Sequence, residues 1–136
     1  MQYASPMSHH AAVWIDHKEA RIFHVGEGTF DESTLHAPHH IARHEKSQTS
    51  DKYNAEEERL FFHQVAEALA TANDVLVMGP STGKLHFLKY AQKHDQKLEA
   101  RIVGMETVDH PSDKQIVAYV RDYFFMNAHR TQKPVA

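Results

Sequence analysis

The sequence predicts an α/β fold in which helices flank a mixed five-stranded sheet, in the order β-β-β-α-β-α-β-α. Two observations predict it. The N-terminal part alternates short apolar runs with polar turns, which indicates antiparallel strands. The rest alternates buried-strand patterns with amphipathic helix patterns, which indicates parallel strands joined by crossover helices. A length of 136 residues, 41% of them hydrophobic, suits one domain with one core.

The first three strands form an antiparallel unit. Residues 11–15 are apolar, residues 16–19 form a polar turn, and residues 20–25 return as a second strand of a hairpin. Residues 29–37 form a weaker third strand. We expect it at the edge of the sheet, where Pro38 ends it, because proline cannot donate to a strand ladder.

Residues 39–53 have no hydrophobic period and are predicted to be an exposed, mobile loop. A helix is expected to follow it. Asn54 can cap this helix, with Glu57 as the reciprocal partner three residues later. Its expected apolar face contains Phe61, Val65, Ala68, Leu69 and Ala72.

The second half supplies two further strands and two helices. Residues 75–78 and 101–105 are predicted strands, and residues 82–94 form a helix between them, with Leu85, Leu88 and Ala91 facing inward. A capping box begins at Ser112 and starts the last helix. Its expected buried stripe contains Ile116, Val117, Val120, Tyr123 and Phe124. We expect one domain over residues 11–125, with flexible ends at 1–10 and 126–136.

Polar residues follow the predicted parallel strands. If the first strand runs parallel to the two later ones, their carboxyl ends meet at one rim of the sheet, where open α/β sheets bind ligands. The residues expected at this rim are Asp16, His17, Gly79, Ser81, Thr82, Lys84, Glu106, Asp109 and His110.

The segment Gly79–Lys84 resembles a phosphate-binding loop but does not meet its requirements. A P-loop places four residues between its glycines and a Ser or Thr after its lysine. Here three residues separate Gly79 from Gly83, and Leu85 follows Lys84. An ATPase is therefore excluded, while the helix start keeps the character of a weak anion site.

The amino-acid composition argues against several classes of function. The formal charge of −3 argues against a strongly basic nucleic-acid-binding protein, although a local patch can still be basic. Cysteine is absent, which excludes thiol nucleophiles and thiolate metal sites. No apolar run approaches the roughly 20 residues that cross a bilayer, and the first ten residues lack the core of a signal peptide. We predict a cytoplasmic protein without a membrane partner or a cofactor.

Three stretches resemble the middle domain of eukaryotic and archaeal peptide-chain release factors and of the rescue factor Pelota, which has a ribonuclease-H-like fold. Residues 13–23 are similar to that family's opening, a strand, an aspartate, a short turn, Ala-Arg and a second strand. Residues 74–81 resemble its strand that ends in a glycine before a helix. Residues 101–104, continued through 109–112, resemble its last strand and the polar turn after it. The resemblance spans about residues 11–125 and implies a small bacterial relative of this translational machinery component group.

One departure from the family bears on activity. Release factors carry Gly-Gly-Gln before the first helix, and its glutamine promotes hydrolysis of peptidyl-tRNA. Gln48 lies in the corresponding loop without preceding glycines, so we assign it no catalytic role. The resemblance then implies a non-catalytic binding protein that associates with the ribosome or with structured RNA. The candidate RNA- or anion-binding residues are Arg43, Lys46, Ser81, Thr82, Lys84, Lys89 and Lys93.

Two alternatives involve other chemistry. A metal-dependent hydrolase or nuclease would use Asp16, Glu106 and Asp109 as converging carboxylates, although turn formation and helix capping also explain two of them. Histidines around Pro38 are candidate metal ligands, for which a solvated loop is the competing interpretation. These histidines are His36, His39, His40 and His44.

The third alternative is a pH-responsive interaction module, because the 13 histidines make the net charge sensitive to mild acid. Aromatic pairs at residues 61–62 and 124–125 lie on neighbouring helix faces. We expect one member of each pair to be exposed, which would provide the surface of a homo-oligomer.

Overall fold

The computed structural model describes residues 9–26, 28–38 and 51–126. The elements follow in the order β1 (His10–Ile15), β2 (Glu19–Val25), β3 (Phe30–His36), α2 (Asp51–Ala68), β4 (Asp74–Gly79), α3 (Gly83–His94), α4 (Gln96–Arg101), β5 (Ile102–Thr107) and α5 (Asp113–Arg121). A π-helical turn, Asp122–Met126, continues α5. Within these ranges, no helix combines the length and the apolar character that a bilayer span requires.

The five strands form one mixed sheet in the order β3-β2-β1-β4-β5. The first three strands pair antiparallel, and β1, β4 and β5 pair parallel. This confirms the predicted five-stranded mixed sheet. Strand β3 lies at an edge, as expected, and most of its side chains are exposed.

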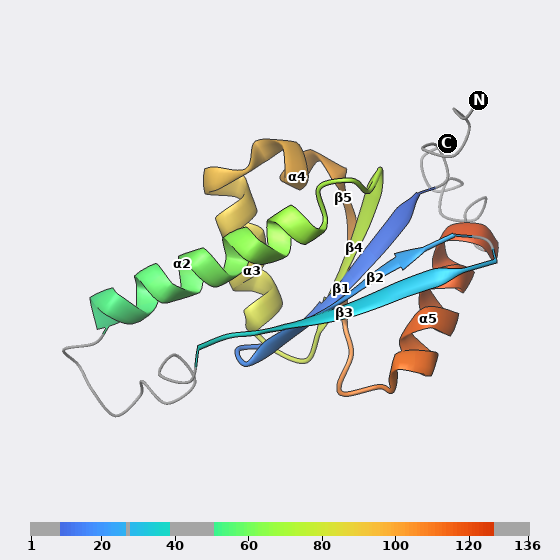
Figure 1. The fold of residues 1–136 in the computed structure, drawn as a ribbon, viewed down its shortest axis with the longest axis horizontal. Coiled ribbons are helices and arrows are strands. Elements are labelled where there is room, and N and C mark those ends of the chain that lie inside the picture. The colour runs from blue at the N-terminus through green and yellow to red at the C-terminus, as the bar shows by residue number, and fades with distance from the viewer. Residues whose placement is uncertain (1–8, 27, 39–50, 127–136) are drawn as a thin grey trace.

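Helices cover both faces of the sheet, with α2, α3 and α4 on one face and α5 on the other (Figure 1). The alternation of side chains along β1 makes this possible. Val13 and Ile15 point to the core under α2 and α3, whereas Ala12 and Trp14 point to the core under α5. All four are fully buried, so β1 is the central strand of both cores.

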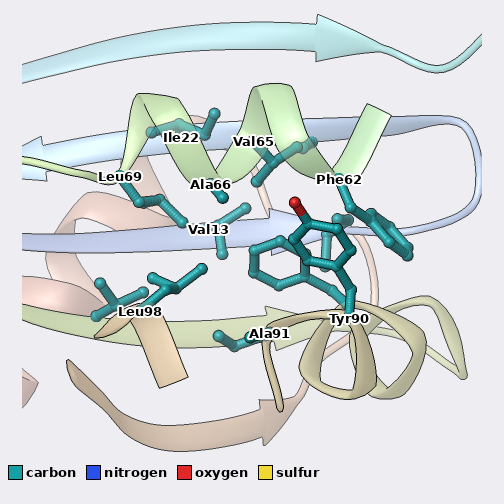
Figure 2. Packing of buried hydrophobic residues seen from close by; sticks show 14 of the residues in the cluster. Val13, Ile22, Phe62, Val65, Ala66, Leu69, Tyr90, Ala91 and Leu98 are labelled. Carbon is teal, nitrogen blue, oxygen red and sulfur yellow. The ribbon is translucent and has the colours of Figure 1, made fainter. Parts of the chain in front are cut away.

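The larger core is built around aromatic side chains from α2 and α3 (Figure 2). The Phe62 ring packs edge-on against Phe87, with 5.4 Å between ring centroids. Phe61 and Phe62 are 4% and 5% exposed, so the expectation that one of them lies on the surface is wrong. Phe124 and Phe125 are partly buried against the smaller core. Both Phe61 and Phe62 belong to the larger core, and Phe62 also packs against the Tyr90 ring of α3, with 5.8 Å between ring centroids.

Helix α2 begins earlier than predicted, at Asp51. Asn54 therefore lies inside the helix, and the predicted loop to residue 53 overlaps the first helical turn. The capping pattern at Asn54 therefore placed the start of this helix about one turn too late.

Helix α3 buries a face that differs in part from the predicted one. Ala91 is buried as predicted, but Leu85 is 45% exposed and Leu88 is only partly buried, whereas Phe87 and Tyr90 are buried. Both candidate stripes have i, i+3 spacing, and a shift of one residue turns the helix by about 100°. Close packing selects the second stripe, because a Cβ on Gly83 would stand 3.0 Å from the Asp16 backbone.

Helix α4 was not predicted. It spans six residues and buries one side chain, Leu98, so it is too short to show a hydrophobic period. Asp95 begins it as an N-cap, with its carboxylate accepting from the Leu98 amide at 3.0 Å. The predicted strand over 101–105 consequently starts and ends later, at residues 102 and 107.

The capping box of α5 is confirmed. The Ser112 hydroxyl accepts from the Gln115 amide at 3.2 Å, and the Gln115 side chain accepts from the Ser112 amide at 2.9 Å. Ile116 and Val120 are fully buried, so this helix closes the second face of the sheet.

Candidate functional site

The carboxyl ends of β1, β4 and β5 lie at one rim, as expected from their parallel pairing. The rim is tightly built. A Cβ on Gly79 would stand 2.2 Å from the carbonyl oxygen of Ile15, so only glycine permits this approach of β4 to β1. The loop from 79 to 83 therefore lies directly against the turn that follows β1.

Asp16 shapes that turn. One carboxylate oxygen accepts from the backbone amides of Lys18 at 2.8 Å and Glu19 at 2.9 Å. This is the turn chemistry that aspartate commonly provides at the start of a hairpin. The other oxygen lies 3.7 Å from Nε2 of His110.

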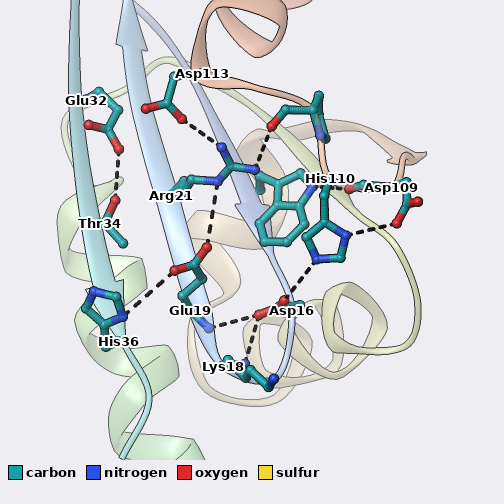
Figure 3. A network of polar contacts seen from close by, with 12 residues as sticks. Asp16, Lys18, Glu19, Arg21, Glu32, Thr34, His36, Asp109, His110 and Asp113 are labelled. Atoms are coloured by element: carbon teal, nitrogen blue, oxygen red, sulfur yellow. Dashed lines mark hydrogen bonds and ion pairs between the residues drawn. The ribbon is translucent and has the colours of Figure 1, made fainter.

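A polar network holds the loop after β5 against the sheet (Figure 3). The Trp14 indole N–H donates to the Asp109 carbonyl at 2.7 Å. The Arg21 guanidinium donates to the Asp113 carboxylate at 2.7 Å and to the Pro111 carbonyl at 3.0 Å. It also stacks over the Trp14 ring, 4.6 Å from its centroid. These contacts position α5.

The three rim carboxylates do not form a metal-binding cluster. The Asp109 side chain is highly exposed, and its Oδ1 forms a hydrogen bond with Nδ1 of the neighbouring His110 at 2.9 Å. Glu106 lies by Tyr119, where burial and then the Glu106 charge raise the pKa of the phenol. In the ranges that the structure describes, the residues with metal-ligand spacing are others, His17, Glu58 and His86.

An apolar pocket of about 440 Å³ opens beside this rim, between the loop after β5 and α5. Met78 and Ile116 contribute apolar surface, and Gln115 and Tyr119 add polar groups. Burial raises the pKa of Tyr119, so its hydroxyl stays protonated at neutral pH.

The predicted anion site at the start of α3 is largely engaged in internal contacts. Lys84 is 6% exposed, and its ammonium donates to the Ser81 carbonyl at 2.7 Å. The Thr82 hydroxyl hydrogen-bonds Nε2 of His17 at 3.0 Å. The Lys84 charge therefore points inward and stabilises its own loop.

A second hollow, of about 240 Å³, lies between α2 and α3, and we call it the α2–α3 groove. Lys89 and Lys93 line it and are exposed, and neither forms an ion pair with any residue that the structure describes. They lie one helical turn apart and so share a face. Its complete lining is Ala55, Glu58, Arg59, Phe62, His86, Lys89, Tyr90, Lys93 and His94.

Two further groups set the charge of the groove. Arg59 forms an ion pair with Glu56, and their hydrogen bond lowers the pKa of that carboxyl, so Arg59 contributes little net charge. Burial raises the pKa of Tyr90, which stays neutral. The groove is therefore cationic because of its two lysines, although Glu58 adds one negative charge to its lining.

Several predicted residues lie elsewhere. Arg43, Lys46, His39, His40 and His44 fall outside the described residues. His36 lies on the exposed edge strand, 3.8 Å from the Glu19 carboxylate. Sequence reasoning identified Lys89 and Lys93 but missed Arg59, which reaches the groove from α2.

Solved structures of Pelota and of an archaeal translation termination factor share this fold. Archaeoglobus fulgidus Pelota matches with a TM-score of 0.59 and 13% identity, over 85% of this chain and 31% of that one. Thermoplasma acidophilum Pelota matches with a TM-score of 0.54 and 18% identity, over 85% and 32%. An archaeal translation termination factor, aRF1, matches with a TM-score of 0.56 and 11% identity, over 93% and 42%.

The chain thus spans less than half the length of each of these proteins. The likeness confirms the predicted fold resemblance to the release-factor and Pelota family. At these identities it establishes the fold alone. No protein-family model and no curated protein sequence matches the chain.

Proposed function

We propose that this chain is a non-catalytic RNA-binding module that associates with the ribosome or with structured RNA in translation. The observation that carries the proposal is the α2–α3 groove, where Lys89 and Lys93 are exposed and unpaired with described residues. Lysine ammonium groups in such an arrangement contact phosphates and fix the position of a nucleic acid, without reading its sequence.

The shared fold supports the translation link. The matched proteins are Pelota and the translation termination factor aRF1, and this chain corresponds to about a third to two fifths of their length. We do not propose peptide release, because Gln48 has no preceding glycines. The rim carboxylates do not converge either, so the hydrolase alternative has no support from geometry.

The overall charge of −3 is compatible with this proposal. Screening at physiological salt limits the reach of exposed charges to about 8 Å. A phosphate in the groove therefore senses the lysines more strongly than acidic residues on the opposite face. Binding should be modest and strongly dependent on salt.

The test is binding of a fluorescent structured RNA to the Lys89→Glu/Lys93→Glu variant, measured by anisotropy from low to physiological salt. Each lost phosphate contact lowers the salt slope by about 0.7–0.9. We expect the double variant to bind at least tenfold more weakly at low salt, with a slope smaller by about 1.4–1.8.

The matched control is Lys97→Glu/Lys114→Glu, which changes the net charge equally at exposed positions on α4 and α5. The control should retain most of the wild-type affinity. Equal losses in both variants would mean that only the net charge matters, and the groove would not be the binding site.

A further inference from the structure

A cluster of two histidines and one glutamate joins three elements near the α2–α3 groove. His17 lies in the turn after β1, Glu58 lies in α2, and His86 lies in the first turn of α3. Each offers one ligand atom, and the three atoms lie within 4.8 Å of one another. In the described part of the chain, no other group of three His, Cys, Asp or Glu residues meets this spacing.

We propose that His17, Glu58 and His86 bind one divalent transition-metal ion of the zinc class. This proposal goes beyond RNA binding and does not depend on it. Zinc takes nitrogen from histidine at about 2.0–2.1 Å and oxygen from carboxylates at about 2.0–2.2 Å, usually in tetrahedral geometry. Magnesium and calcium instead require mostly oxygen ligands.

The ligand spacing is close to what zinc needs. Two ligands at tetrahedral angles around zinc stand about 3.3 Å apart. Oε2 of Glu58 and Nδ1 of His86 are already 3.6 Å apart. The rings of His17 and His86 meet edge-on, with 5.4 Å between centroids. Both rings are exposed, so side-chain rotation alone can close the remaining distance.

Thr82 provides the supporting contact that metal-binding histidines usually have. Its hydroxyl hydrogen-bonds Nε2 of His17 at 3.0 Å, and its carbonyl accepts from the His86 amide at 3.0 Å. An imidazole has two nitrogens, so one can bond to the hydroxyl while the other coordinates. Such outer contacts fix the orientation of the ring. Thr82 thus connects both histidines of the cluster.

Three protein ligands leave a fourth zinc position open to water or to another oxygen ligand. Glu58 and His86 also line the α2–α3 groove, so a metal ion held by them would lie at the wall of this groove. A bound dication would reverse the local charge there. It would also tie the β1–β2 turn to α2 and α3.

The test uses the full chain, produced without a histidine tag and freed of metal by a chelator. Zinc binding is measured by calorimetry, and cobalt coordination by the visible absorption of four-coordinate Co²⁺. We expect one tight equivalent of zinc and a higher Tm in its presence. His17→Asn, Glu58→Gln and His86→Asn should each weaken binding by more than about 100-fold, and Thr82→Val by about 10-fold.

The matched control is His63→Asn, since His63 and Glu67 pair at 3.3 Å on α2 without a third ligand of metal-binding spacing. It should bind zinc like the wild type. A second control replaces His39, His40 and His44 with Asn. Loss of the tight equivalent in this control, or its survival in His17→Asn and His86→Asn variants that fold by circular dichroism, would overturn the proposal.

Discussion

Lys84 has the sequence context of a phosphate-binding lysine, but in the structure it stabilises its own loop. It follows Gly83 at the start of a helix, the position from which a P-loop lysine reaches phosphate. Its ammonium turns back to the Ser81 carbonyl, and its stem joins the buried side of α3. Lysine and arginine commonly bury their stems in this way while their head groups find polar partners.

Replacing Lys84 with Met should therefore reduce stability rather than RNA binding. The variant keeps an apolar stem but leaves the Ser81 carbonyl without its charged donor, which costs about 1–3 kcal/mol. Urea unfolding measures the change. Lys89→Met is the control, since an exposed lysine should change stability by less than about 0.5 kcal/mol. Equal stabilities for the two variants would show that the contact with Ser81 contributes nothing.

The junction between β1, β2 and α2 is held by a histidine pair. His24 Nε2 lies 2.8 Å from the Ala68 carbonyl, which can only accept, so Nε2 carries the proton. In neutral His24, Nδ1 must then accept from His9 Nε2 at 2.9 Å. Burial, and then the charge of His24, lower the pKa of His9.

The lowered pKa of His9 predicts a pH-dependent stability. The unfolded chain binds a proton at His9 more readily than the folded chain, so folding is favoured at high pH and loses stability as pH falls through about 6.5. We expect urea midpoints to fall between pH 7.5 and pH 5.5. The fall should be smaller in His9→Gln, whereas the exposed control His63→Gln should behave like the wild type. A flat profile for the wild type would contradict the assignment.

Across the whole molecule, the sequence predicted the features that depend on local pattern. Strand identities, the parallel pairing of β4 with β5, the edge position of β3 and the Ser112 capping box are confirmed, and β1 meets the condition of running parallel to β4. Helix α4 was missed because six residues carry no period, and the exposed face of α3 was misassigned because two stripes had equal spacing.

The candidate sites were less accessible to sequence reasoning. Lys89 and Lys93 share a helix, so their common face could be predicted. His17, Glu58 and His86 come from three separate elements, and their approach depends on how Gly83 packs against Asp16. Such long-range proximity has no local signature in a single sequence.

The most direct test of the translation-linked function is co-sedimentation of the protein with ribosomes in cell lysate, at low and high salt. We predict that the wild type migrates with a ribosomal subunit at low salt and is released at high salt. The Lys89→Glu/Lys93→Glu variant should remain at the top of the gradient at low salt, and the Lys97→Glu/Lys114→Glu control should migrate like the wild type. Recovery of the wild type only at the top of the gradient, at both salt concentrations, would contradict a ribosome-associated role.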